Sequence, residues 1–267
     1  MYPYLCYFFI YAVLGWCLEV TYAAVCEGTF VNRGFLNGPL CPVYGVGAVI
    51  VIFCLTPLRE NTIVLFLCAV ALASLLEWAT GFVLETLFHQ KWWDYSNEPF
   101  NISGYICLKF SLLWGVACLV VMEIIHPAVA AFVRWIPPTA TNILLGTLGI
   151  VMLLDILATV QSVLNLNRRL KQIDALGGKI KHISDGVGVN LSGEVLKVAQ
   201  KTETWKQTYK ESLDAAAAMR AQLRTKQDAL TQKLHYTQVR LIKAFPDLKS
   251  NRYKDALEKI KRTVHKK

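Results

Sequence analysis

The chain has 267 residues, 54% of them hydrophobic, and a formal net charge of +9 at pH 7. Residues 1–164 hold five basic and nine acidic residues, whereas residues 165–267 hold 23 basic and ten acidic ones. An apolar, charge-poor front joined to a basic tail excludes a single soluble globular domain, a secreted disulfide scaffold and a disordered chain. The composition therefore predicts an integral membrane protein.

Five apolar stretches are candidates for membrane-spanning helices, because a bilayer core about 30 Å thick needs ~20 mostly apolar residues per helix. They cover residues 4–25, 42–55, 63–88, 105–125 and 143–164. The second stretch is short for a span and can borrow residues 35–40. Residues 126–138 are too short to span and indicate an interfacial loop or half-helix. The sequence thus predicts an all-α, polytopic membrane helix bundle of about five transmembrane helices within residues 1–164.

The orientation follows from the basic residues that begin the tail. Arg168, Arg169 and Lys171 lie within a few positions of the last span, and such residues mark the cytoplasmic side of a membrane. The tail is therefore expected in the cytoplasm and, with five spans, the N-terminus outside. No cleavable signal peptide is predicted, because the first three residues carry no Lys or Arg and the apolar run is too long. The expected location is the cell membrane, with loops 28–41 and 89–104 facing the cytoplasm.

The tail, residues 165–267, is predicted to be helical and coiled-coil-like. A helical stripe continues past the fifth span until Gly177-Gly178, which should end it, and turn signals predict a loop over residues 180–193. A long helix is expected over residues 194–244, where Leu223 and Leu230 begin a partial heptad seam. A last amphipathic helix follows, with Tyr253, Ala256, Leu257, Ile260 and Val264 on one face.

Two uses of this tail remain open. It can form a helical hairpin or coiled coil that packs on itself or on a second copy, or its basic faces can bind anionic lipid or a cytoplasmic partner. Nucleic acid is not an expected partner, because acidic residues are interspersed with the basic ones and no aromatic stacking platform accompanies them.

Acidic residues at membrane depth are the first functional signal, since burying one costs roughly 2.5–3.5 kcal/mol on insertion scales. They are Glu19, Glu77, Glu85, Glu123 and Asp155. Glu77 and Glu85 lie about 80° apart around an ideal helix, so they can share one polar face. Glu123 lies near a span end and can reach the interface, whereas Asp155 sits mid-span with little polar company on its own helix.

The second signal is the segment 28–41 with the residues that follow it. Gly34, Gly38, Pro39 and Pro42 prevent a regular helix, yet the segment is too apolar for a solvated loop. Non-helical backbone at this depth is tolerated where it is buried in protein or lines a water-filled cavity. We therefore expect a re-entrant or pocket-lining segment in which Asn32 and Arg33 face membrane acids, Glu19 first. The alternative is a tight interhelical loop whose Arg33 caps carbonyls.

The third signal is the run Lys91-Trp92-Trp93-Asp94-Tyr95-Ser96, followed by Asn101-Ile102-Ser103-Gly104. Tandem tryptophans beside Asp and Tyr are typical of an interfacial aromatic belt. Asp94 and Asn101 can instead turn back to hold Arg33, because both loops are expected on the same side. Asn101-Ile102-Ser103 matches a glycosylation acceptor, but the expected cytoplasmic side argues against its use.

The eight cysteines predict no metal site and no cofactor. All lie in the apolar part, scattered and without a CxxC pair. They are typical of small packing residues within helices, whereas a metal site needs clustered ligands at suitable spacing.

Together these motifs resemble the bacterial membrane family named putative ABC-transporter type IV, a putative ABC transporter permease family. The resemblance covers roughly residues 5–125 and rests on Gly15-Trp16, Glu19, Asn32–Phe35, Gly38-Pro39, Cys41–Gly45, Glu77, Glu85, Trp93–Ser96 and Asn101–Gly104. It implies a transport role. The chain has no GxxxxGK[ST] phosphate loop, so any ATPase would be a separate subunit. Five spans form a small path, which a homodimer would enlarge.

The leading hypothesis is therefore a membrane transport component with a polar cavity. Its candidate cavity residues are Glu19, Asn32, Arg33, Glu77, Glu85, Trp93, Asp94, Tyr95 and Asn101. The surplus of acids suits a cation, an amine or proton coupling. One alternative is a membrane scaffold or regulatory protein whose polar cluster only fixes helix packing. The other is a membrane-embedded enzyme acting on a lipid-linked substrate, with Glu77 or Glu85 as general base, although no activated nucleophile or metal-ligand cluster is visible.

Overall fold

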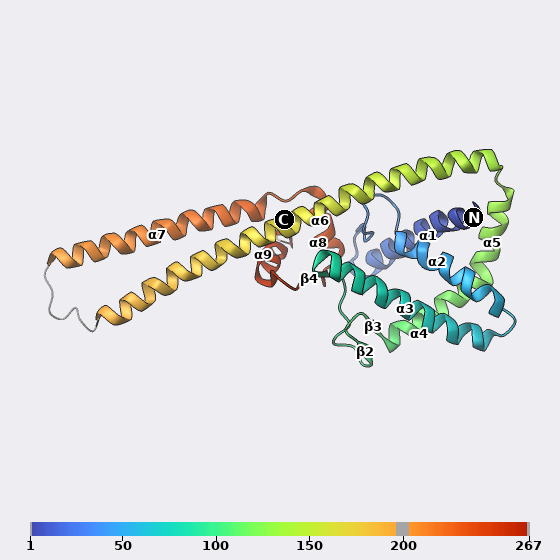
Figure 1. The fold of residues 1–267 in the computed structure, drawn as a ribbon, viewed down its shortest axis with the longest axis horizontal. Coiled ribbons are helices and arrows are strands. Elements are labelled where there is room, and N and C mark those ends of the chain that lie inside the picture. The colour runs from blue at the N-terminus through green and yellow to red at the C-terminus, as the bar shows by residue number, and fades with distance from the viewer. Residues whose placement is uncertain (1, 196–202, 266–267) are drawn as a thin grey trace. The chain divides into compact units, whose positions relative to one another are not determined.

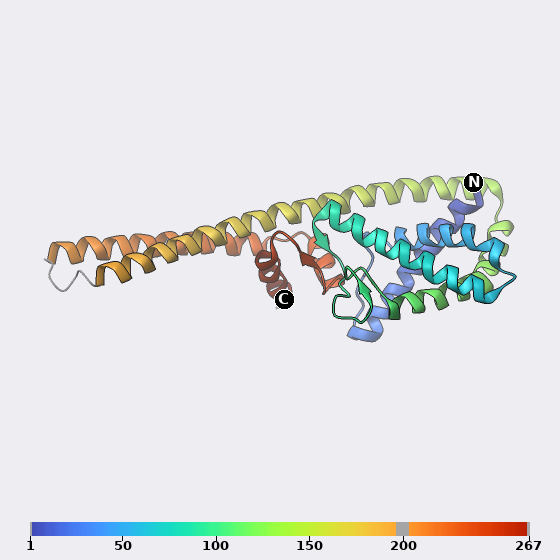
Figure 2. The ribbon, with the colours of Figure 1, turned by 60° about the horizontal axis from the view of Figure 1, so that its bottom comes forward.

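The computed structural model describes residues 2–195 and 203–265 (Figures 1 and 2). The chain divides into two compact units. The first, called the transmembrane unit below, comprises residues 1–164 together with residues 236–251. The second, called the tail unit, comprises residues 165–235 and 252–267. Residues 236–251, expected in the tail, therefore belong with the transmembrane helices.

The described elements are predominantly helical (Figure 1). In chain order they are α1 (Tyr2–Glu27), α2 (Pro42–Leu55), a 3₁₀ turn (Thr56–Leu58), α3 (Thr62–Phe88), β1 (Gln90–Lys91), β2 (Asn101–Ile102), β3 (Ile106–Cys107), α4 (Leu108–Val120), a π-helical turn (Val121–Ile125), α5 (His126–Trp135), α6 (Pro138–Val195), α7 (Glu203–Gln232), α8 (Tyr236–Ala244), β4 (Lys249–Ser250) and α9 (Lys254–His265).

The fold is the predicted all-α polytopic membrane bundle. Among the described residues, four helical stretches are long and apolar enough to cross a membrane, namely Pro3–Cys26, Thr62–Phe88, Leu108–Trp135 and Pro138–Asp185. The predicted second span is also helical, but α2 with its 3₁₀ turn covers only Pro42–Leu58 and is shorter than the others. Residues 126–135 form the predicted half-helix, α5, which continues α4 through the π-helical turn.

Local signals explain where the helices start and end. Asn61 caps α3, because its Oδ1 accepts hydrogen bonds from the backbone N–H groups of Ile63 and Val64, both at 3.1 Å. Such caps satisfy N–H groups that have no partner within the helix. At the other end of α3, His89 adopts φ +54° and its N–H bonds back to the carbonyl of Glu85. The chain thereby turns out of the helix into loop 89–107.

Two apolar clusters form the interior of the transmembrane unit. One joins α1, α2, α3 and the π-helical turn through Tyr11, Val51, Ile52, Leu55, Leu65, Ala69 and Met122. The other joins α1 to segment 28–41 through Phe9, Ala12, Leu36 and Leu40, with α6 packed alongside. Gly45 allows α1 and α2 to approach closely, since a Cβ there would lie 2.5 Å from the Phe8 carbonyl. Leu36 is fully buried, so segment 28–41 is part of the core.

Three non-helical or short segments meet at one end of the transmembrane unit. They are segment 28–41, loop 89–107 and residues 236–251, which are joined by hydrogen bonds and by the antiparallel pairing of β1 with β4. The N-terminus, the turn after α2 and α5 lie at the opposite end (Figure 1). The candidate site residues in loops 28–41 and 89–107 therefore share one end of the unit.

The tail unit has its own apolar core. Leu166, Leu170 and Ile173 of α6 are at most 1% exposed, as are Leu257 and Ile260 of α9. Polar contacts tie the helices together as well. The side chain of Gln227 on α7 donates to the Ile173 carbonyl at 3.0 Å and accepts from Lys259 of α9 at 2.7 Å. Lys259 also pairs with Asp228 at 2.9 Å.

Two predictions for the tail are wrong and one is confirmed. Gly177-Gly178 does not stop α6, which continues through the predicted loop 180–193 to Val195. Contacts with α7 accompany this continuation, because Gln227 donates to the Ile173 carbonyl one turn before Gly177. The helix predicted over 194–244 is interrupted at residues 233–235, and its residues 196–202 lie outside the described structure. The final amphipathic helix is confirmed as α9.

Candidate functional site

Asn32 organises the start of the non-helical segment 28–41. Its Oδ1 accepts hydrogen bonds from the indole Nε1 of Trp16 at 2.8 Å and from the backbone N–H of Gly34 at 3.0 Å. Its Nδ2 donates to the Asn37 carbonyl at 2.9 Å. One amide side chain thus links α1 to both ends of a turn.

Two charged side chains from distant elements satisfy the backbone of the same segment. Asp155 on α6 accepts hydrogen bonds from the backbone N–H groups of Asn37 at 3.1 Å and Gly38 at 2.7 Å. Arg240 on α8 donates to the carbonyls of Gly34 at 2.6 Å and Phe35 at 2.9 Å. Buried backbone groups need such partners. Asp155 has few polar neighbours on its own helix, and these hydrogen bonds give it a structural role in holding segment 28–41.

The expected pairing of Arg33 with Glu19 is present. The Nε of Arg33 lies 3.5 Å from Oε2 of Glu19, and both side chains are about three-quarters buried. The hydroxyl of Tyr44 on α2 donates to Oε1 of the same carboxylate at 2.5 Å. The guanidinium of Arg33 also lies over the ring of Tyr22, 5.1 Å from its centroid, in cation–π geometry. Glu19 is thus shared by α1, α2 and segment 28–41.

Glu77 is the least satisfied acid at membrane depth. The hydroxyl of Tyr95 donates to its Oε1 at 3.3 Å, and the side chain of Trp114 lies beside the same carboxylate. Its Oε2 is buried and makes no well-formed hydrogen bond among the described residues. Tyr95 stacks on Phe110, with ring centroids 4.7 Å apart. Burial first, and then the charge of Glu77, raise the pKa of Tyr95 above its usual range. The phenol therefore stays protonated and keeps its role as a donor.

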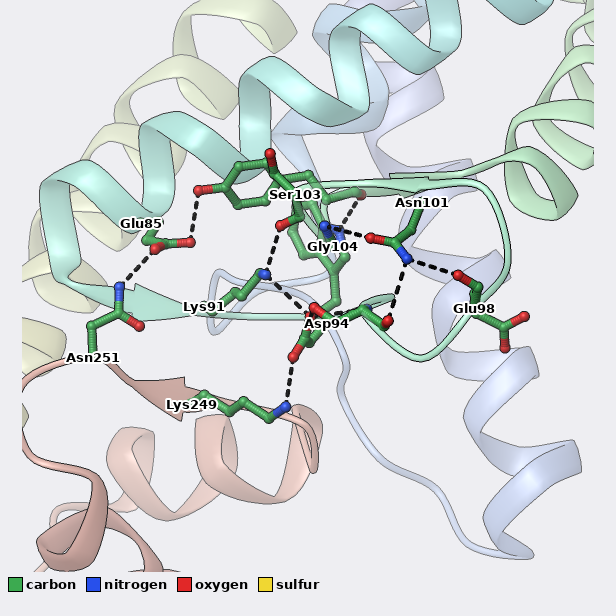
Figure 3. Close-up of polar contacts among 12 residues, drawn as sticks. Glu85, Lys91, Asp94, Glu98, Asn101, Ser103, Gly104, Lys249 and Asn251 are labelled. Atoms are coloured by element: carbon green, nitrogen blue, oxygen red, sulfur yellow. Dashed lines mark hydrogen bonds and ion pairs between the residues drawn. The ribbon is translucent and has the colours of Figure 1, made fainter.

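Asp94 lies at the centre of a second polar cluster, in loop 89–107 (Figure 3). It pairs with Lys249 of β4 at 2.5 Å and with Lys91 at 3.1 Å, and it accepts from the backbone N–H of Ser96 at 3.1 Å. Burial alone would raise the pKa of Asp94, but the hydrogen bonds from Lys249, Ser96 and Lys91 outweigh it and hold that pKa well below its usual range. Asp94 is a carboxylate throughout the physiological range.

Asn101 and Glu85 complete this cluster. The Nδ2 of Asn101 donates to the Glu98 carbonyl at 2.8 Å, and its Oδ1 accepts from the Gly104 N–H at 3.3 Å (Figure 3). Glu85 accepts from the hydroxyl of Tyr105 at 2.8 Å and from Asn251 at 2.6 Å. Trp93 donates its indole N–H to the Tyr105 carbonyl at 2.9 Å.

The nine predicted site residues therefore divide into two groups. Glu19, Asn32, Arg33, Glu77 and Tyr95 lie between helices, whereas Glu85, Trp93, Asp94 and Asn101 order loop 89–107. The alternative in which Asp94 and Asn101 hold Arg33 is wrong. Arg33 pairs with Glu19 because segment 28–41 packs on α1, while two lysines neutralise Asp94.

Sequence reasoning missed the contributions of residues 236–251. Arg240, Lys249 and Asn251 each contact a residue of the predicted site or its backbone. Their positions are more than 150 residues from those partners, and a basic tail gave no reason to single out one arginine or lysine. An unassigned mid-span acid, Asp155, was the one available sign that segment 28–41 had a distant partner.

The fold and these polar groups define a polytopic helical membrane protein with charged side chains inside its bundle. Residues 6–160 match the family described as "Putative ABC-transporter type IV", and the chain belongs to this family. No curated protein and no solved structure matches the chain. Membership supports a transport-related membrane protein. The matched region ends before residues 236–251, which complete the polar clusters.

Proposed function

We propose that the protein is the membrane component of a transport system for a cation or an amine. Glu19, Asn32, Arg33, Glu77 and Glu85 would line the substrate path, and the path's mouth would be formed by Trp93, Asp94, Tyr95 and Asn101. The observation that carries the proposal is the buried Oε2 of Glu77, which makes no well-formed hydrogen bond among the described residues, although Tyr95 and Trp114 lie beside the carboxylate. A buried carboxylate oxygen without a partner is costly, and a transient cationic substrate would satisfy it.

The orientation and partners belong to the same proposal. The basic tail is placed in the cytoplasm, with the N-terminus outside, by the positive residues that follow the last span. Energy would come from a separate ATP-binding subunit, because the chain carries no phosphate-binding loop. A homodimer would widen the path.

Uptake by membrane vesicles tests this function. The vesicles come from a strain of the native host that lacks the gene and is complemented with each variant, so that any ATP-binding subunit is present. The probes are radiolabelled methylammonium and rubidium, with ATP supplied at the cytoplasmic face. Transport by the wild type should fall at least tenfold in Glu77→Gln and Arg33→Gln at equal protein level.

Glu60→Gln is the matched control, because Glu60 is an exposed acid in the turn between α2 and α3. It should transport as the wild type does. Equal accumulation of both probes in wild-type vesicles and in vesicles from the deletion strain would refute cation or amine transport.

A scaffold or regulatory role is the second candidate, favoured by one specific observation. Asp155 and Asn32 have their polar atoms engaged by backbone and side chains of the same unit, as expected for groups that fix packing. Under this reading, substitutions at Glu19 and Arg33 would change stability, and no uptake would depend on them.

A further inference from the structure

Residues 236–251, hereafter the closing segment, lie against the end of the transmembrane unit where the candidate site loops meet. α8 contacts segment 28–41 through Arg240. β4 pairs antiparallel with β1 of loop 89–107, so that Ser250 lies opposite Gln90. One segment, remote in sequence, therefore contacts both loops.

Arg240 makes the most specific of these contacts. Its side chain is buried, with the residue 7% exposed. Nη1 donates to the carbonyls of Asn32 at 3.2 Å and Gly34 at 2.6 Å, while Nη2 donates to that of Phe35 at 2.9 Å. A planar guanidinium presents several donors in a fixed fork, which matches three carbonyls of one turn. The conformation that presents Asn32 and Arg33 thus depends on a residue of the closing segment.

The closing segment also makes apolar and polar contacts with residues at the mouth of the proposed path. The ring of Phe245 meets Trp92 edge-on with centroids 4.9 Å apart, and Trp92 meets Phe35 in the same way at 5.2 Å. Lys249 pairs with Asp94, and Asn251 binds Glu85 (Figure 3). The closing segment therefore contacts three of the nine candidate site residues, Asn32, Glu85 and Asp94.

We propose that the closing segment is the cytoplasmic gate of the path, positioned by Arg240, and that it must leave both loops for substrate to pass. This rests on the proposed function, since a gate requires a path. Leu241, Ile242 and Leu248 are at most 1% exposed, so the closing segment is shut in this structure, and opening would expose these side chains. Opening therefore requires free energy that the closing segment does not itself supply. Both ends of the segment continue directly into the tail unit, at His235 and Arg252, so a partner that moves the tail can pull the gate open.

The native thiol of Cys41 reports on the gate without an engineered probe. Cys41 ends segment 28–41 and is 7% exposed. Its Sγ lies 3.5 Å from the position of a Cβ on Gly34, whose carbonyl accepts from Arg240. Release of Arg240 should expose this thiol. Cys107 in β3, 1% exposed, should stay shielded and show that the unit is folded.

The first experiment follows N-ethylmaleimide labelling of each cysteine in the purified full-length protein by peptide mass spectrometry. Arg240→Ala should raise the labelling rate of Cys41 at least tenfold. Arg240→Lys should raise it less, because one ammonium cannot serve three carbonyls in that geometry. Lys243→Ala, an exposed change on the same helix, is the control and should match the wild type. Wild-type labelling of Cys41 in Arg240→Ala would refute the positioning role.

A second variant tests the gate without removing the Arg240 contact. Gln90→Cys with Ser250→Cys places two thiols across the β1–β4 pair, in a chain whose exposed Cys17, Cys26 and Cys54 are replaced by serine. Diamide should cross-link the pair and reduce vesicle uptake of methylammonium at least fivefold, and dithiothreitol should restore it. Equal uptake by cross-linked and reduced protein would refute the gate.

The two readouts separate failure of the gate from failure of the proposed function. Uptake that persists in the cross-linked protein refutes the gate and leaves transport standing. Protection of Cys41 that depends on Arg240, in a protein without uptake of either probe, refutes transport and with it the gate, while Arg240 remains the residue that holds segment 28–41.

Discussion

Asp155 and Arg240 both form hydrogen bonds with the non-helical backbone of segment 28–41, Asp155 as the acceptor and Arg240 as the donor. Asp155 accepts the N–H groups of Asn37 and Gly38, and Arg240 donates to the carbonyls of Asn32, Gly34 and Phe35. Backbone that leaves a helix inside a membrane needs internal partners. One acid and one base, more than 80 residues apart, supply them and so allow segment 28–41 to lie within the bundle.

Asp155→Asn should therefore destabilise the transmembrane unit. The amide keeps one oxygen but turns an N–H donor toward the backbone N–H of Gly38, and loss of a hydrogen bond to a charged group costs about 1.5–3 kcal/mol. The apparent melting temperature in detergent should fall by several degrees. Asp174→Asn, an exposed change on the same helix, is the control and should leave it unchanged. Equal melting temperatures for all three proteins would contradict the role given to Asp155.

Arg33 and Glu19 offer a test that separates packing from transport. Each single change to Gln leaves the other charge without its partner at 3.5 Å, whereas the double change leaves two neutral amides. Stability of the double variant should therefore recover by ~1 kcal/mol relative to the sum of the single effects. Uptake of methylammonium should not recover, because the proposed path needs both charges. Full recovery of uptake would show that the pair only fixes packing.

The sequence predicted the parts of this protein that have local or periodic signals. Apolar stretches located the spans, and Gly34, Gly38 and Pro39 located the non-helical segment. Glu19 was found as the partner of Arg33 because both flank the same helix end. These features depend on residues that lie near one another in the chain.

Contacts between distant segments could not be predicted in the same way. Gly177 was expected to end a helix from its weak helix propensity, but α6 continues through it, beside the bond from Gln227 of α7 to the Ile173 carbonyl. Arg240 is one of 23 basic residues in a tail whose charge was already explained by its side of the membrane. Nothing in its neighbours distinguishes it, since its partners are three backbone carbonyls about 205 positions earlier.

Attachment of loop 89–107 to the closing segment should resist mild acid. The pKa of Asp94 lies below that of an unfolded aspartate, about 3.9, because the hydrogen bonds from Lys249, Ser96 and Lys91 outweigh burial. A lowered pKa means that its contribution is fully present above about pH 4 and is lost as pH falls further. The difference in melting temperature between the wild type and Asp94→Asn should be constant from pH 5 to 8.

The same difference should shrink below pH 4, where the carboxylate takes up a proton. Glu98→Gln is the control, because the Glu98 side chain is only partly buried and Asn101 contacts the backbone carbonyl of Glu98. It should show no such pH dependence relative to the wild type. A difference between wild type and Asp94→Asn that already declines between pH 7 and 5 would contradict the lowered pKa.

Labelling from either side of the membrane tests the orientation and the short second span together. Loop 28–41 and loop 89–107 share one end of the transmembrane unit, and the turn that holds Glu60 lies at the other.

If α2 crosses the bilayer and the tail is cytoplasmic, Glu60→Cys should react with an impermeant maleimide added to intact cells. Lys210→Cys, at an exposed position of α7, should react at least tenfold faster after permeabilisation. Glu98→Cys should behave as Lys210→Cys does, because α3 carries the chain back across. Labelling of Glu60→Cys only in permeabilised cells would place that turn inside and overturn the five-span arrangement.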